Sequence, residues 1–219
     1  MKEFRPGCSA AILSGLLFLG AALPPKQSPP SVDKTVRAFL EKMAHRWRDL
    51  NVPAADGELL YNIVLERGYT RALEVGTSTG LSGIYIAWAL SKTGGKLVTI
   101  EIDRDRHAEA VGNFREAGLS AFIDARLADA HELVAELPGP FDFVFLDADK
   151  DWYENYARAV IPKIVSGGCL AAHNVYPSRG GWGRGGASGY YDYMRSLPEF
   201  DGRILTGGSG SLSVSYRTK

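Results

Sequence analysis

The sequence is poor in the residues that build disulfide frameworks and zinc sites. Its 219 residues include only two cysteines and four histidines. Cys8 lies near the N-terminus and Cys169 opens an apolar segment, so the pair matches neither a disulfide scaffold nor the spacing of a structural zinc site. The chain must therefore rely on a hydrophobic core, and its 45% hydrophobic content is sufficient for one domain.

The sequence also lacks net charge, because 25 basic residues balance 25 acidic ones. Proteins that bind nucleic acid usually carry a basic excess, which attracts the phosphate backbone over long distances. No nucleic-acid partner is therefore expected, and a small molecule is the more natural ligand.

No apolar stretch has the length of an ordinary membrane span, which needs ~20 residues. The stretch Ala10–Leu23 is shorter, follows Lys2 and Arg5, and precedes a proline-rich segment. Basic, apolar and then helix-breaking residues in this order are typical of an export signal or anchor. Residues 1–31 are thus predicted to be a signal-like or anchor segment with a linker, and the protein to be exported or membrane-anchored. The alternative is an unstructured extension or misassigned start on a cytoplasmic protein.

From residue 32 to residue 219, helix and strand patterns alternate, which predicts one α/β domain with a Rossmann-like parallel sheet and helices on both faces. The last two strands flank the turn sequence TGGSG and are predicted to pair antiparallel. Apolar runs predict strands at 71–75, 96–100, 121–127, from Phe141, at 169–172, 203–205 and 211–216. Helical spacing predicts helices around 36–43, at 59–64 after a turn at 51–57, and at 80–90, 104–117, 131–137 and 152–164.

A glycine loop, ALEVGTSTGLSG, follows the first predicted strand. Gly76 and Gly80 allow the backbone to turn tightly and to approach a ligand, but their spacing differs from the dinucleotide and phosphate-loop fingerprints. Glu101 ends the second strand ~20 residues beyond Gly80, where a carboxylate accepts hydrogen bonds from ribose in this architecture. A nucleoside-containing ligand is therefore predicted. A plain strand-to-helix turn and a solvated acidic helix start are the simpler alternatives.

The segment FDFVFLDADK turns abruptly from apolar to charged residues, at Asp147, Asp149 and Lys150. An uninterrupted apolar run is typical of a buried parallel strand, and ligands bind beyond the carboxyl ends of such strands. The charged residues are thus predicted to lie at a functional edge of the sheet. The alternative is a polar loop in which Asp149 caps the next helix.

At these motifs the chain resembles the S-adenosylmethionine (SAM)-dependent O-methyltransferases of the caffeoyl-CoA and catechol type. LEVGTSTGLS, VTIEIDRDR, LADA, FDFVFLDADKDWYENY and SLSVSY occur in the same order and spacing. The resemblance implies a seven-stranded sheet in the order 3-2-1-4-5-7-6, SAM as cofactor, a small hydroxylated, catechol-like acceptor and a homodimer. Its cofactor-binding residues would be Glu74, Gly76, Ser78, Gly80, Ser82, Glu101, Ile102, Asp129, Ala130 and Asp147. Glu101 would hold the ribose, and Ile102, Asp129 and Ala130 would border the adenine.

The resemblance also assigns catalysis to Asp147 and Lys150. The aspartate would bind a divalent cation that holds two vicinal hydroxyls, and the lysine would take a proton from the reacting oxygen. An Asp-Asn pair usually completes the cation site, but this chain has His173 and Asn174 there. Imidazole binds Mn²⁺, Fe²⁺ or Zn²⁺, whereas Mg²⁺ prefers oxygen, so the predicted ligands Asp147, His173 and Asn174 do not assure a magnesium site.

Three roles remain open for His173: a transition-metal ligand, a metal-free general base, or a spectator in a SAM-binding homologue with altered or lost metal-dependent catalysis. The other histidines, at positions 45, 107 and 131, are predicted to be solvated or structural. The aromatic residues after Lys150 are expected in part to border the acceptor, and the glycine-rich segment 176–191 to form a lid or a surface loop.

Overall fold

The structure is a computed structural model that describes residues 30–47, 50–176, 186–205 and 211–219. The apolar stretch at 10–23 and most of the glycine-rich segment at 176–191 lie outside the described residues. Among the helices within the described ranges, none has both the length and the apolar character needed to cross a membrane.

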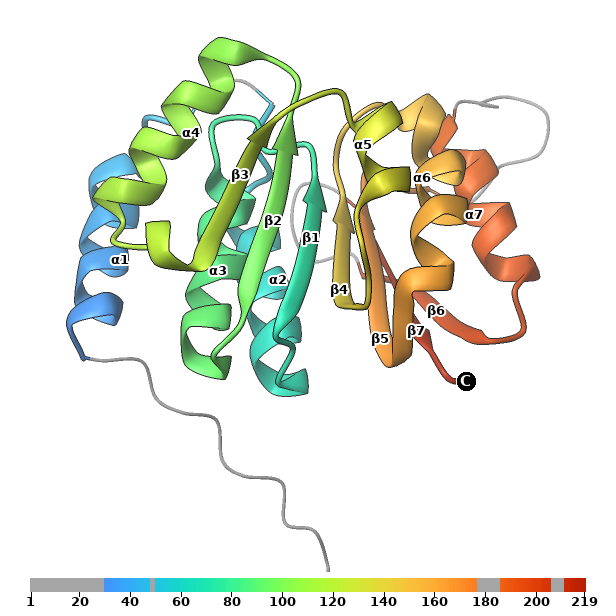
Figure 1. The fold of residues 1–219 in the computed structure, drawn as a ribbon. Coiled ribbons are helices and arrows are strands. Elements are labelled where there is room, and N and C mark those ends of the chain that lie inside the picture. Colours follow the sequence, from blue (N-terminus) through green and yellow to red (C-terminus); the bar gives the residue numbers. More distant parts are fainter. Residues whose placement is uncertain (1–29, 48–49, 177–185, 206–210) are drawn as a thin grey trace, which may run out of the picture.

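A seven-stranded sheet with the order β3-β2-β1-β4-β5-β7-β6 forms the centre of the molecule (Figure 1). β7 runs antiparallel to both of its neighbours, and the other pairings among β1 to β5 are parallel. The predicted fold, strand order and terminal hairpin are thus confirmed. The strands are β1 (Arg71–Val75), β2 (Lys96–Glu101), β3 (Ile123–Leu127), β4 (Phe141–Leu146), β5 (Ile164–His173), β6 (Phe200–Leu205) and β7 (Leu212–Arg217).

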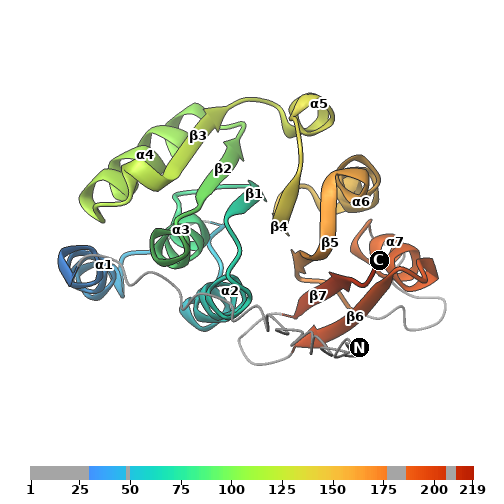
Figure 2. The same ribbon diagram turned by 60° about the horizontal axis from the view of Figure 1, so that its bottom comes forward.

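Helices cover both faces of the sheet, with α1 to α4 on one side and α5 to α7 on the other (Figure 2). Three short 3₁₀ turns interrupt the connections, at 120–122, 150–152 and 161–163. The helices are α1 (Pro30–Met43), α2 (Ala54–Arg67), α3 (Leu81–Thr93), α4 (Arg104–Glu116), α5 (Ala130–Glu136), α6 (Tyr153–Val160) and α7 (Gly186–Ser196).

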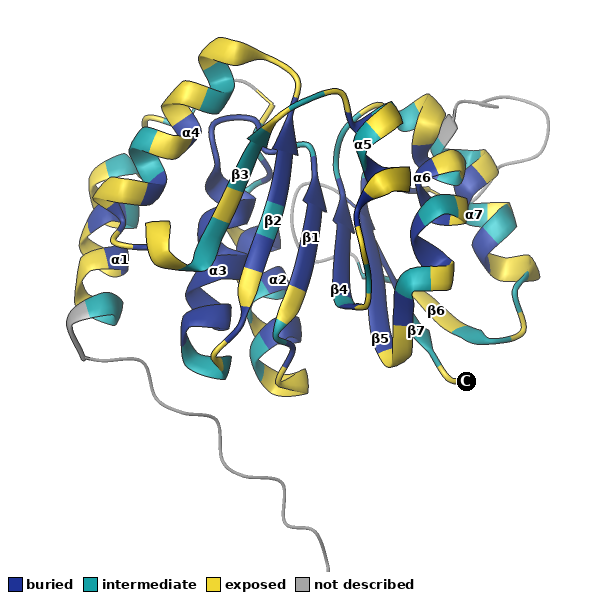
Figure 3. Cartoon of the chain, viewed as in Figure 1, coloured by how far each residue is buried: buried dark blue, intermediate teal, exposed yellow. Residues whose placement is uncertain are grey.

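The central strand β4 shows why residues 143–146 are apolar without interruption. Phe143 and Phe145 pack into the core under α2 and α3, whereas Val144 and Leu146 pack into the core on the opposite face. All four side chains are fully buried (Figure 3). Burial of each stabilises the fold by about 1.5–3 kcal/mol, so a charge at any of these four positions would be costly. Asp147 therefore marks the carboxyl edge of the sheet.

Two helix boundaries differ from the prediction. α2 begins at Ala54, inside the segment predicted to be a turn, because Pro53 directly precedes the helix, where a residue without an N–H costs no helical hydrogen bond. This change places Asp56 in the first turn of a helix, where it is buried. The predicted helix at 152–164 is shorter, because Pro162 cannot continue the α-helical hydrogen bonds and a 3₁₀ turn leads into β5.

Three strand boundaries also differ from the prediction. β3 begins at Ile123 because residues 120–122 form a 3₁₀ turn. β5 and β6 are longer than predicted, because pairing with β4 and β7 extends through residues of low apolar content such as Gly202. A strand inside a sheet is held by its neighbours, so pairing overrides a weak local pattern.

The prediction that residues 176–191 form a loop is wrong for its last part. α7 begins at Gly186, and Tyr190 is fully buried in it. The ring of Tyr190 packs edge-on against Tyr153, with ring centroids 5.7 Å apart. Tyr190 is therefore a core residue. Trp182, another aromatic residue of the segment predicted to be a lid or loop, lies outside the described residues.

Candidate active site

The loop between β1 and α3 brings backbone amides to the carboxyl edge of the sheet. Gly76 has a φ of 98° and Gly80 a φ of 101°, a conformation that glycine adopts without strain. The amides of Gly76 and Thr77 both donate to the carbonyl oxygen of Ile100, over 3.0 and 3.2 Å. The loop is thereby fixed to the end of β2.

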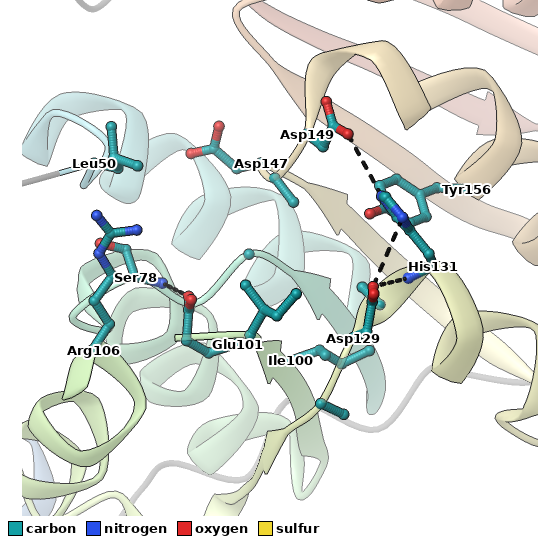
Figure 4. Close-up of a pocket in the computed structure, with 15 residues that line it drawn as sticks. Leu50, Ser78, Ile100, Glu101, Arg106, Asp129, His131, Asp147, Asp149 and Tyr156 are labelled. Carbon is teal, nitrogen blue, oxygen red and sulfur yellow. Dashed lines mark hydrogen bonds and ion pairs between the residues drawn. The ribbon is translucent and has the colours of Figure 1, made fainter. Parts of the chain in front are cut away.

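Glu101, at the end of β2, holds the same loop with its side chain. Oε2 accepts a hydrogen bond from the Ser78 amide over 2.7 Å, and Oε1 accepts one from the Asp103 amide over 2.9 Å (Figure 4). Ser78 has a positive φ of 48°, which this hydrogen bond helps to maintain. Each carboxylate oxygen has more than one lone pair, so Glu101 retains acceptor capacity for a ligand.

Two asparagines fasten the loop from other elements, and the local sequence gave no indication of them. Asn51 donates to the Thr79 hydroxyl over 2.7 Å and accepts from the Leu81 amide over 3.3 Å. Asn113, on α4, donates to the Thr79 carbonyl over 2.8 Å. Both lie about 30 residues from the loop, as the fold alone brings them together.

A cavity of about 430 Å³ opens beside this loop. Eight of its lining residues were not predicted to bind the cofactor. Conversely, Glu74, Gly80 and Ser82 were predicted to bind it but are not among the described residues that line the cavity. Glu74 instead accepts a hydrogen bond from the Thr99 hydroxyl over 2.6 Å, within the fold. The predicted cofactor residues that line the cavity are Gly76, Ser78, Glu101, Ile102, Asp129, Ala130 and Asp147.

His131 forms part of the cavity wall, although the sequence pattern assigned it no role in the site. Its ring stacks on Trp152 with centroids 3.8 Å apart. Its Nε2 lies 3.5 Å from Asp149 Oδ2 (Figure 4). Asp129 accepts a hydrogen bond from the His131 amide over 2.8 Å and so caps α5. Asp149 likewise caps the 3₁₀ turn that follows it.

Lys150 is held at the rim by two partners. Its Nζ lies 2.6 Å from Asp147 Oδ1 and donates over 2.6 Å to the Tyr153 hydroxyl. Tyr153 in turn donates to the Leu146 carbonyl over 2.9 Å. Burial raises the pKa of Tyr153 well above its ordinary value, so this hydroxyl keeps its proton. Lys150 therefore has a fixed position beside Asp147, which lines the cavity.

His173, at the end of β5, lies between two carboxylates. Its Nδ1 is 3.4 Å from Asp147 Oδ1, and its Nε2 is 3.0 Å from Asp56 Oδ2. Burial opposes the charged ring, but hydrogen bonds and charges of Asp147 and Asp56 together raise the pKa of His173 above its ordinary value. Asp56 was not predicted as a site residue, because it lies 117 residues from His173 in the sequence.

A family model described as O-methyltransferase matches residues 29–179. The chain belongs to the O-methyltransferase family. Curated relatives include the caffeoyl-CoA O-methyltransferase of Zinnia elegans, 29% identical over 80% of this chain and 73% of that protein. Caffeoyl-CoA O-methyltransferase 1 of Eucalyptus globulus is 29% identical over 72% of this chain. The matched part spans 64% of the Eucalyptus protein, less than two thirds of its length.

Solved structures of O-methyltransferases have the same architecture. The enzyme from Bacillus cereus, in complex with SAH, aligns with a TM-score of 0.73 and 25% identity over 84% of this chain and 91% of that chain. TomG from Streptomyces achromogenes, in complex with SAM, aligns with a TM-score of 0.69 and 24% identity over 89% of this chain and 92% of that chain. The likeness to TomG concerns the fold alone.

In this O-methyltransferase family member, the side chains at the predicted cation site fit a divalent metal poorly. Asp147 Oδ1 already contacts the Lys150 ammonium, and both ring nitrogens of His173 face carboxylates. Of the three predicted ligands, only Asp147 and Asn174 offer oxygen, the donor that Mg²⁺ prefers. Across the described ranges, no group of three or more histidine, cysteine, aspartate or glutamate side chains is arranged to hold a metal ion.

Glu74 gives this O-methyltransferase a pH-sensitive core. Its carboxyl is fully buried, and burial raises its pKa to about 7, opposed by hydrogen bonds from Ser82 and Thr99. Such a group stabilises the fold fully below its unfolded pKa of 4.5 and loses that contribution as the pH rises through about 7.

We therefore expect Glu74→Gln to flatten the pH dependence of stability of the ligand-free protein. Between pH 5 and 8.5 the parent should lose on the order of 3 kcal/mol more unfolding free energy than the variant, because only the parent must bury a charge. Urea denaturation at several pH values measures the difference. Glu132→Gln, at an exposed position on α5, is the control and should follow the parent. Parallel curves for the parent and Glu74→Gln would contradict the prediction.

Proposed function

We propose that this protein is a SAM-dependent O-methyltransferase acting on a hydroxyl of a small, aromatic, catechol-like acceptor. The observation that carries the proposal is the Gly76–Gly80 loop, fixed by Glu101 and opening onto a cavity lined by Asp147, whose carboxylate contacts Lys150. Family membership supports the reaction class. The SAH complex of the Bacillus cereus relative supports the cofactor.

The cavity has the donor and acceptor groups that this cofactor requires. Glu101 has acceptor capacity for the two ribose hydroxyls, and Ile102, Asp129 and Ala130 form the wall assigned to the adenine. His131 extends that wall with a flat ring stacked on Trp152. Bound there, the cofactor supplies an electrophilic methyl group on a sulfonium sulfur.

Lys150 is the proposed proton acceptor. In its neutral form Nζ has one lone pair for the acceptor's hydroxyl proton, while its N–H groups still reach Asp147 and Tyr153. The O–H bond of the acceptor breaks, its oxygen uses an electron pair to form the new O–CH₃ bond, and the electrons of the S–CH₃ bond remain on sulfur. Because Lys150 and the residues lining the cavity have fixed positions, they orient the acceptor hydroxyl toward the methyl group, and this orientation contributes to the rate.

Calorimetric titration tests the cofactor assignment. We expect the protein to bind SAM and SAH but not NAD, and Glu101→Gln to weaken SAM binding by roughly 10- to 100-fold, because hydrogen bonds to a charged group are worth about 1.5–3 kcal/mol. Glu109→Gln removes an exposed carboxylate from neighbouring α4 and serves as the control. Tight NAD binding without SAM binding would overturn the proposal.

A second candidate is a SAM-binding homologue without metal-dependent transferase activity, which the His173 substitution favours. The two candidates share the cofactor and differ in turnover on a panel of catechols. The homodimer and a role of residues 10–23 in export or membrane anchoring are further proposals, supported by the family resemblance and by the residue order of the leader. Light scattering and N-terminal sequencing of the mature protein test them.

A further inference from the structure

We propose that a chain of four side chains, Asp56, His173, Asp147 and Lys150, takes the place of the divalent cation in this protein, with Asp56 as the residue that positions His173. This inference rests on the proposed function, because it assumes that the acceptor hydroxyl binds beside Asp147. We call these four residues the charge chain.

Both ends of the His173 ring are engaged. Nε2 lies 3.0 Å from a carboxylate oxygen of Asp56, and Nδ1 lies 3.4 Å from one of Asp147. A ring with a single N–H would direct the lone pair of its other nitrogen at a carboxylate, so the geometry matches a ring that donates from both nitrogens. With Lys150 still protonated, before it acts as the base, the two positive and two negative charges of the chain cancel.

Asp56 gives the charge chain its fixed position. Only 1% of its surface is exposed, and it enters from the first turn of α2 to meet the end of β5. A fully buried carboxylate is stable only with a partner, and Nε2 of His173 meets Asp56 from the neighbouring element. With Nε2 held there, Nδ1 is directed toward Asp147 and cannot rotate away.

The same geometry disfavours a metal ion. A dication at Asp147 would share Oδ1 with the Lys150 ammonium at 2.6 Å and face the His173 ring at 3.4 Å. Like charges at such distances repel strongly inside a protein. In the family pattern that the sequence resembles, a second carboxylate stands where His173 stands. The family's second carboxylate would attract a metal ion. In this chain His173 stands in its place and contacts Asp147 directly.

Metal binding can be measured without an acceptor, so the first experiment is a titration of Mn²⁺ and Zn²⁺ into the SAH-loaded protein, with metal analysis of the purified chain. We expect no stoichiometric metal and no saturable binding to the parent. The double variant His173→Asp with Asp56→Asn, which restores an acidic residue beside Asn174 and removes the opposing charge, should gain Mn²⁺ binding. Stoichiometric binding to the parent that is lost in His173→Ala would overturn the proposal.

The second experiment measures turnover on catechols with and without a chelator. We expect the parent to be unaffected by EDTA, and Asp56→Asn to lower kcat by roughly 10- to 100-fold with an unchanged SAM affinity, the size seen when a partner that orients a histidine is removed. Glu58→Gln, exposed on the same helix, should match the parent. Loss of activity in EDTA with recovery in Mn²⁺ would overturn the proposal. If the proposed function is wrong, the protein will not bind SAM, and this result is distinct from any result on metal binding. The metal titration uses the parent protein, so it remains informative even if a variant folds poorly.

Discussion

Replacing Lys150 by methionine is expected to lower the rate of methyl transfer by roughly 10²- to 10⁴-fold, the usual contribution of a general base. Methionine keeps an unbranched apolar stem, so the packing beside Tyr153 should change little. The lone pair that takes the hydroxyl proton is lost, and so are the 2.6 Å contacts to Asp147 and Tyr153. Because Lys150 does not line the cavity assigned to the cofactor, SAM affinity should stay within a factor of about two.

Steady-state kinetics with a catechol acceptor, together with calorimetry for SAM, separate these effects. Lys96→Met is a suitable control, because Lys96 is exposed where β2 begins, at the opposite end of the strand from Glu101. A Lys150→Met enzyme that turns over like the Lys96→Met enzyme would show that another group accepts the proton.

Gly76→Ala is expected to destabilise the protein by more than about 3 kcal/mol and to abolish SAM binding. The backbone of Gly76 has a φ of 98°, which strains any residue with a Cβ atom. The added Cβ would also lie 2.5 Å from the Asp147 carbonyl oxygen and 2.9 Å from the Ala148 nitrogen. These are backbone atoms at the end of β4, so relief requires the ends of β1 and β4 to separate, which adds the cost of overpacking.

Gly68→Ala provides the matched control. Gly68 has a φ of 66°, but a Cβ built there meets no atom within 4 Å. Its substitution should cost only the conformational strain, about 1 kcal/mol. Chemical denaturation of both variants measures the difference. Equal stabilities would mean that the contact between the loop and the end of β4 is more compliant than its geometry indicates.

The fold was predictable because its main determinants are local in the sequence. The apolar runs of β1 and β4 and the helical spacing of α4 are visible without knowledge of any contact. The start of α2 was not predictable, since Pro53 forms no side-chain cap and the preceding sequence has turn composition. The shortening of α6 could have been found from Pro162, which interrupts the helical pattern.

The candidate site was predictable where residues follow directly on strands. Glu101, Asp147 and His173 all end strands whose carboxyl ends meet at one edge, and the structure brings them there. The contacts of these residues were not predictable. Asp56 and Asn113 reach the site across the fold, and no spacing in the sequence relates them to His173 or to the glycine loop.

The contact between Asp56 and His173 also bears on which acceptors can react. A chelated cation selects for bidentate acceptors, because two vicinal oxygens must enter its coordination shell together. The charge chain has no coordination shell to fill, and the reacting oxygen needs only to meet Lys150. If the charge chain replaces the cation, we expect the choice of acceptor to depend on the shape of the site around one reacting oxygen, and we expect monohydroxylated aromatic compounds to be accepted as well as catechols.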